Sequence, residues 1–103
     1  MTDREMLEFA AKAAGIDVSF IGPLGVYTRK TETKPWNPIT DDGDAFRLMV
    51  RLRLPIRDGL NGTVETGNER SGRPIWELWE DDPLAATRRV IVRAAAEIGR
   101  QMP

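Results

Sequence analysis

A proline-rich segment followed by three aspartates constrains the middle of this chain more than any other feature. The two prolines of segment 34–39 fix their own φ angles and keep the residues before them out of the helical region, so this segment is predicted to be extended or turning. Thr40 or Asp41 can then cap a helix, while Asp42 and Asp44 place negative charge at the positive end of its dipole. A helix is therefore predicted to begin at this point.

The run that follows the aspartates admits two interpretations. A helix over 42–53 would gather its apolar residues on one arc and set two arginines opposite: Ala45, Leu48, Met49 and Leu52 against Arg47 and Arg51. Every second residue from Phe46 to Ile56 is also apolar, and such alternation is typical of a half-buried strand. The acidic cap, the helix-forming residue types and the length of the run favour the helix, which Pro55 would end.

Two further helices are predicted at the ends of the chain. Thr2 and Glu5 have the spacing of a capping box for a helix over 3–14, and Gly15 follows it as a left-handed terminator. Asp82 is an N-cap followed by Pro83 at the first helical position. The apolar stripe of this last helix consists of Leu84, Thr87, Ile91, Ala95, Ile98 and Met102.

Four strands are predicted between the helices, over 16–21, 26–31, 63–66 and 74–80, with turns at 22–25 and 57–62 and a loop at 67–73. The expected order is α-β-β-α-β-β-α. It predicts a single α+β domain over 1–103, an α/β sandwich with one mainly antiparallel four-stranded sheet and helices on both of its faces. Because Trp76 and Leu78 alternate with Ile75 and Trp79, the last strand carries large apolar groups on both faces, which predicts a strand covered on both sides.

The absence of histidine and cysteine excludes most common catalytic and metal sites. Without them the chain has no imidazole base, catalytic triad, thiolate nucleophile or sulfur-based metal site. We therefore expect no enzyme activity, no cofactor and no metal. The net charge of −1 gives no global attraction to nucleic acid. The sequence has no run long enough to span a membrane and no basic, apolar start typical of a secretory signal, so a cytoplasmic location is expected.

The charged clusters have plain structural interpretations beside their functional ones. Asp41, Asp42 and Asp44, and also Asp81 and Asp82, are best explained as helix caps, although the two clusters would form a carboxylate site if they met in space. Arginines at helical spacing are typical of a solvent-facing side, but they can also track phosphates. The arginines considered for nucleic acid are Arg89, Arg93 and Arg100.

Tryptophans are the candidates for a partner-binding surface. Trp36 is expected to be the most exposed of the three because it lies between prolines in a loop. The predicted partner-binding patch therefore consists of Trp36 and Asn37 together with Arg47 and Arg51 of the following helix.

Two segments taken together resemble a family of small tailed-phage and prophage proteins, some of which carry the label of a phage α–β–α sandwich domain. The first is Trp36-Asn37-Pro38 with Asp41-Asp42-Gly43-Asp44-Ala45 and Arg47-Leu48; the second is Asp82-Pro83 with Ala85-Ala86-Thr87-Arg88-Arg89, Ile91-Val92-Arg93 and Ala94-Ala95-Ala96-Glu97-Ile98-Gly99. The chain departs from the family mainly over 59–74. The resemblance implies an α/β sandwich encoded by a prophage in a bacterial host, and it supplies no activity and no catalytic residue.

Three hypotheses follow. The favoured one is a non-enzymatic phage or prophage accessory protein that binds a host or phage protein through the patch near Trp36. The alternative is a nucleic-acid-associated factor that uses its arginine-rich helix faces. The third, which is the least favoured, is a small carboxylate-dependent enzyme.

Overall fold

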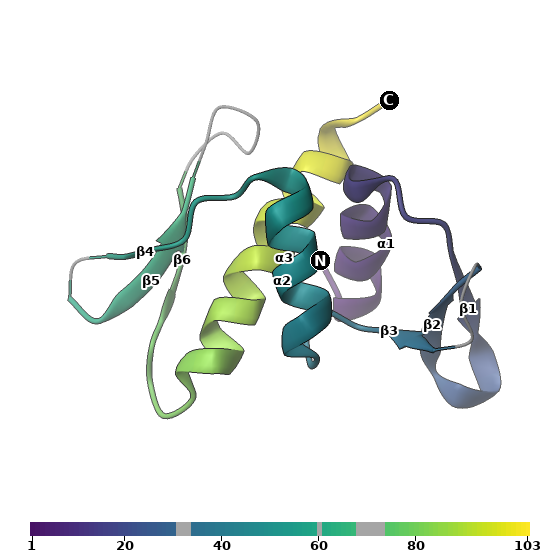
Figure 1. Cartoon of the computed structure of the whole chain (residues 1–103), viewed down its shortest axis with the longest axis horizontal. Helices are drawn as coiled ribbons and strands as arrows, with labels where there is room; N and C mark the ends of the chain where they lie inside the picture. Colours follow the sequence, from purple (N-terminus) through teal and green to yellow (C-terminus); the bar gives the residue numbers. More distant parts are fainter. Residues whose placement is uncertain (31–33, 60, 68–73) are drawn as a thin grey trace.

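Helices form the centre of the molecule, and a small sheet lies on each side of them (Figure 1). The computed structural model describes residues 1–30, 34–59, 61–67 and 74–103, and within these it contains three α-helices, one short 3-10 helix and two three-stranded antiparallel sheets. In chain order the elements are α1 (Asp3–Ala14), β1 (Val18–Ile21), η1 (Gly22–Leu24), β2 (Val26–Arg29), β3 (Pro35–Trp36), α2 (Asp42–Leu52), β4 (Arg57–Asp58), β5 (Thr63–Thr66), β6 (Ile75–Leu78) and α3 (Pro83–Gln101).

The helix predictions are confirmed, including their caps. Thr2 Oγ1 accepts from the backbone N–H of Glu5 at 3.1 Å, and the Thr2 N–H donates to the Glu5 carboxylate at 3.0 Å, so the capping box is complete. That backbone donor lowers the pKa of the Glu5 carboxyl. Asp82 caps α3 by accepting from the Ala85 N–H at 3.0 Å. Residues 42–52 are helical, so the strand interpretation of this run is wrong.

The prediction of one four-stranded sheet is wrong. The first sheet has the order β1-β2-β3 and the second has the order β4-β5-β6, with every neighbouring pair antiparallel. The strand predicted over 63–66 is confirmed with the same bounds, and the other three predicted strands exist but are shorter. Each sheet also gains a two-residue strand, β3 or β4, that is too short to leave a periodic signal in the sequence. Most of the predicted loop over 67–73 lies outside the described residues.

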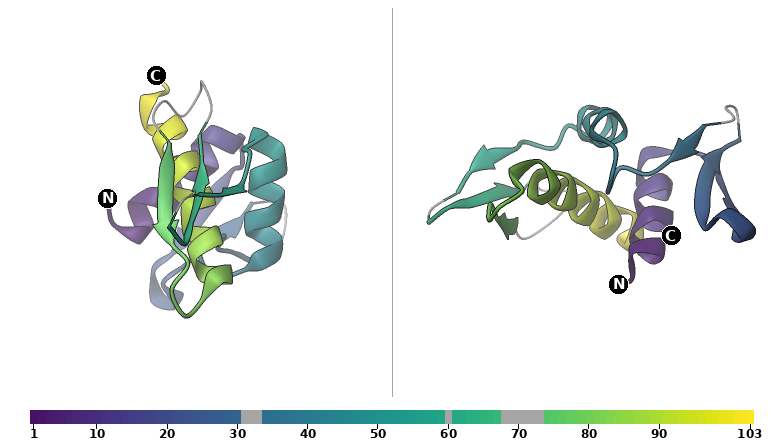
Figure 2. Two further views of the ribbon diagram at one scale, coloured as in Figure 1. Left: turned by 90° about the vertical axis from the view of Figure 1, so that its left-hand side faces the viewer. Right: turned by 90° about the horizontal axis from the view of Figure 1, so that it is seen from below.

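The layers are also inverted relative to the prediction. The sequence predicts a sheet between helices, whereas the helices lie between two sheets in Figure 1 and in the right-hand view of Figure 2. Small residues explain the difference, because Ala10, Ala11 and Ala14 of α1 and Ala94 and Ala95 of α3 are all buried. Helices with alanine faces approach each other closely, and α1 packs more extensively against α3 than against any other element.

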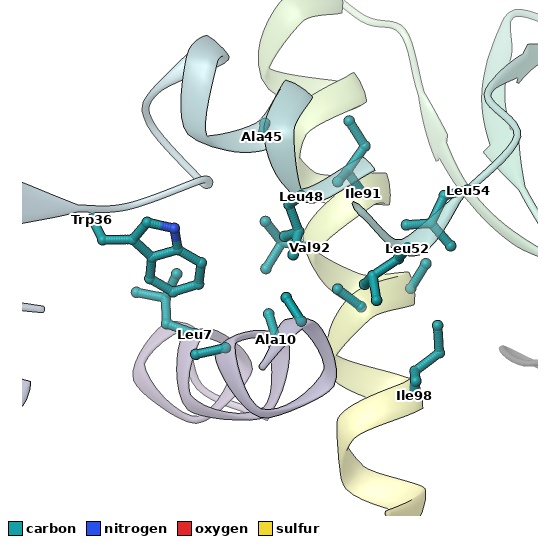
Figure 3. Close-up of a cluster of buried hydrophobic side chains, with 14 of the residues drawn as sticks. Leu7, Ala10, Trp36, Ala45, Leu48, Leu52, Leu54, Ile91, Val92 and Ile98 are labelled. Carbon is teal, nitrogen blue, oxygen red and sulfur yellow. The ribbon is translucent and has the colours of Figure 1, made fainter. Parts of the chain in front are cut away.

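The main core lies where the three helices meet (Figure 3). Leu7 of α1, Leu48 and Leu52 of α2 and Ile91 and Val92 of α3 converge there. A smaller cluster joins the second sheet to α3, and it contains Val64, Ala86 and Val90. Each sheet therefore packs one face on the helical layer.

Gly99 marks the closest approach of α1 and α3. A Cβ built on Gly99 would lie 1.9 Å from the backbone oxygen of Phe9, a separation that no side-chain rotation can relieve. The crossing of α1 over α3 therefore depends on glycine at this position.

We expect Gly99→Ala to destabilise the fold. Alanine normally favours a helix over glycine by about 1 kcal/mol, but overpacking against backbone costs roughly 1–3 kcal/mol or more and should outweigh that gain. Urea unfolding followed by circular dichroism measures the difference. Gly22→Ala is the matched control, because a Cβ there meets nothing within 4 Å. Equal stability of the two variants would contradict the close crossing.

The chain's single tyrosine connects α1 to the first sheet. Tyr27 is buried, its hydroxyl donates to the Glu8 carboxylate, and Arg4 Nε lies 3.4 Å from the same hydroxyl. The ring also packs against Phe20 at a centroid distance of 5.1 Å. Burial, reinforced by the bond to Glu8, raises the pKa of Tyr27.

This raised pKa predicts a loss of stability in alkali. The folded state holds the Tyr27 proton more tightly than the unfolded state, so the stabilisation is complete below the ordinary pKa of about 10 and is lost as pH rises through the folded value. Absorbance of the single tyrosinate should give a midpoint above 10 in the folded protein and near 10 in urea. A folded-state midpoint at or below the urea value would disprove the burial argument. Tyr27→Phe should remove this contribution to the pH dependence.

Candidate interaction surfaces

The predicted exposure of Trp36 is wrong. Its side chain is only 2% exposed and joins the main core beside Leu7 of α1 (Figure 3). The flanking prolines do produce an extended segment, but this segment pairs with β2, with Trp36 opposite Tyr27, and so turns the indole inward. Trp36 therefore offers no surface to a partner.

The other residues of the predicted patch serve the start of α2. The backbone N–H of Asn37 donates to Asp44 at 3.0 Å, and Arg47 donates to the other oxygen of Asp44 at 2.8 Å. A polar hollow of about 420 Å³ lies beside them. Arg51, one turn further along α2, is exposed and makes no ion pair with a residue that the structure describes. The structure thus brings Asn37 and Arg47 together through Asp44, and their contacts organise the helix start.

The arginines considered for nucleic acid are paired with carboxylates. Arg89 and Arg93 both bond Glu77 of β6, and Arg93 also donates to the Trp76 backbone oxygen at 3.0 Å. Arg100 pairs with Glu97 on its own helix, and this bond raises the pKa of the Arg100 guanidinium. These contacts neutralise much of the positive face, and those of Arg89 and Arg93 also hold β6 against α3.

The aspartates act as caps and as an ion-pair partner. Asp41 and Asp82 cap α2 and α3, and Asp42 pairs with Arg88 at 2.6 Å. Among the described residues, no group of three or more carboxylates is placed to hold a metal ion. Arg88 also donates to the Ile39 backbone oxygen at 2.7 Å. One arginine of α3 thereby holds the entry to α2 in place.

An apolar groove runs between α2 and α3. Its hollow has a volume of about 270 Å³, and its apolar lining comprises Ala45, Phe46, Met49, Ile56, Leu84 and Ile91. Phe46 and Leu84 are 61% and 63% exposed, which is unusual for residues of this size. Asp42 and Arg88, which form an ion pair, also belong to the lining.

A second apolar surface covers the outer face of the second sheet. Trp76 and Leu78 are 56% and 47% exposed, while the other face of β6 packs on α3. They line a hollow of about 520 Å³ together with Asp58, Gly59, Asn61, Thr63 and Glu65. Glu65 is bonded by Arg57 at 2.8 Å, and both are partly exposed. Large apolar groups and carboxylates thus meet on one open face.

The sequence held a signal for the second surface and none for the groove. Apolar residues on both faces of β6 indicated two covered faces, and the described residues cover one of them. The spacing of Leu84 fits the apolar stripe of α3 and predicts a packed residue. It lies in the first turn of the helix, beyond the reach of the core, so periodicity could not distinguish it from a core residue.

Comparisons with known proteins identify no relative of this chain. No protein-family model, curated protein or solved structure matches the chain.

Among the described residues, none of the helices is both long enough and apolar enough to cross a membrane.

Arg88 gives a direct test of how α2 is positioned. Arg88→Ala removes the donor to the Ile39 carbonyl and the partner of Asp42, so we expect a loss of about 1–3 kcal/mol in the free energy of unfolding. Chemical unfolding measures it. Arg51→Ala, on an exposed site, should change stability by less than about 0.5 kcal/mol. If both variants lose the same amount, Arg88 does not hold α2.

Proposed function

We propose that this chain is a non-enzymatic phage or prophage accessory protein that binds another protein through the outer face of its second sheet. This surface replaces the patch predicted around Trp36, because the Trp36 side chain is buried. The observation that carries the proposal is the exposure of Trp76 and Leu78, side by side on alternate positions of β6. Exposed aromatic residues that adjoin a hollow are the usual anchors of protein interfaces.

The charges beside Trp76 favour a partner segment that carries a cation. Asp58 and Glu65 are the charged residues that line the hollow, and Arg57, bonded to Glu65, offsets one of the two negative charges. The indole face attracts cations through its π electrons, and the remaining carboxylate adds to that attraction. The proposed ligand is therefore a protein segment with an apolar side chain next to lysine or arginine.

Support for the phage assignment comes from the resemblance, and the structure adds a physical relation between its two segments. Arg88 belongs to the second segment, and it bonds Ile39 and Asp42 within the first. The two segments therefore contact each other and stabilise the helical layer. Their shared residues have a structural role in this chain, whereas the α/β sandwich that the resemblance implies differs from the layer order of this fold.

Two observations favour a protein ligand over the alternatives. The sequence lacks histidine and cysteine, which removes the commonest catalytic groups from consideration. Arg89, Arg93 and Arg100 are each bonded to a carboxylate, so a phosphate backbone would have to compete with those pairs.

Trp76→Ala tests the proposal. Tagged wild-type protein is used to isolate a partner from prophage-induced or phage-infected bacteria, and the purified partner is then titrated against each variant. We expect Trp76→Ala to weaken binding by tenfold or more, since anchor residues typically contribute about 2 kcal/mol. Asp58→Asn should also weaken binding relative to the wild type, because it removes a carboxylate that attracts the cation of the partner. Leu24→Ala, which truncates an even more exposed apolar residue in η1, should leave binding unchanged.

A different result would identify a different function. Binding that is unaffected by Trp76→Ala would contradict the proposed surface. Binding of DNA or RNA that falls steeply with added salt would instead favour the nucleic-acid alternative.

A further inference from the structure

We infer that the chain forms a homodimer through the groove between α2 and α3, with α2 of a second copy lying antiparallel to its own. This surface is separate from Trp76 and Leu78, so the inference does not depend on the proposed function. The argument begins with the distribution of charge along α2.

One stripe of α2 begins with three residues of the groove lining, Asp42, Phe46 and Met49, and continues beyond the groove to the end of the helix. In chain order it consists of Asp42, Phe46, Met49, Val50 and Arg53. At about 100° per residue the four helical positions fall within an arc of about 100°, and Arg53 follows the last helical residue, Leu52, as a left-handed C-cap. The stripe thus has an acid at its start, apolar groups in its middle and a base at its end.

This stripe is complementary to itself in one orientation. If a second α2 lies antiparallel across a two-fold axis, Asp42 of each copy faces Arg53 of the other, and Phe46 faces Met49. A parallel arrangement would place like charges together, which is unfavourable. A two-fold interface uses the same patch on both copies, so a patch with opposite charges at its two ends fits the antiparallel case.

Both charged ends are accessible. The Asp42 side chain is 64% exposed even though one of its oxygens accepts from Arg88, so it can take a second donor. Arg53 is exposed and forms no ion pair within the part of the chain that the structure describes. The net charge of −1 adds little repulsion between two copies.

Arg53 also occupies a position where its side chain is costly. It ends α2 with a φ of 54°, in the left-handed region where glycine is preferred. A residue kept there at the expense of stability is consistent with a side chain that is needed for another purpose. Pairing with Asp42 of a second copy gives it that purpose.

The groove also contains a hollow that can accept the apolar middle of the stripe from a second copy. Phe46 and Val50 are 61% and 55% exposed, and Leu84 of α3 borders the same side. The hollow beside Met49 is lined by Ala45, Ile56 and Ile91, among others. Because Phe46 faces Met49 in the antiparallel arrangement, each phenyl ring is directed at the hollow of the other copy.

Sedimentation equilibrium over a wide concentration range tests the dimer. We expect a species of twice the 11.6 kDa chain mass. Phe46→Glu should abolish it, and Arg53→Glu should weaken it about tenfold or more because two pairs become repulsive. Arg51→Glu is the matched control, since it makes the same charge change on the same helix outside the stripe. Circular dichroism confirms that each variant is folded.

Arg53→Gly separates a role in dimerisation from a structural one. Glycine should raise the stability of the monomer and still weaken the dimer, whereas a purely structural arginine would give no loss of association. A monomer at every concentration up to the millimolar range would overturn the inference. A dimer that survives Phe46→Glu would also overturn it. So would a monomer whose binding to a different protein is lost with Phe46→Glu, since the groove would then serve that protein.

Discussion

The direct contact between α1 and α3 decides how the rest of the molecule is arranged. Buried alanines on both helices, with Gly99 against the backbone of Phe9, bring the two helix axes close together. No sheet can enter between helices that touch in this way. The strands must therefore pack on the outside of the helical layer, and the chain places one sheet on each side of it.

Arg88 adds the third helix to this arrangement. α2 buries Ala45, Leu48 and Leu52, and its entry segment is held by the two bonds that Arg88 donates. Leucines supply most of the free energy of this packing through buried apolar area, but they are weakly directional. The hydrogen bonds of Arg88 fix the direction and register of α2, and hence they set the shape of the groove that α2 forms with α3.

Local elements could be predicted from the sequence because their causes are local. The capping box of Thr2 and Glu5, the Asp82-Pro83 start and the acidic start of α2 each depend on residues within one turn of one another. The arrangement of the sheets could not be predicted in this way. β3 and β4 contain two residues each, too few for a periodic signal, and each adds a third strand to a hairpin by pairing with the strand next to it in the chain. Trp36 shows the consequence, because its pairing with β2 turned an expected surface residue into a core residue.

The same helical contact explains why apolar surface remains open. With a sheet on each side, every sheet has one face on the helices and one face toward solvent. The strand β6 has large apolar residues on both faces, as a strand between two layers would. The described residues cover only the face that packs on α3. The groove lies at the start of α3, where Leu84 of the first helical turn is exposed and lines it together with Phe46 of α2. An arrangement with helices inside therefore leaves two apolar surfaces of different character: a flat, partly acidic sheet face, and a helical stripe with opposite charges at its ends. The difference in shape and charge is the physical reason to assign them to different binding events.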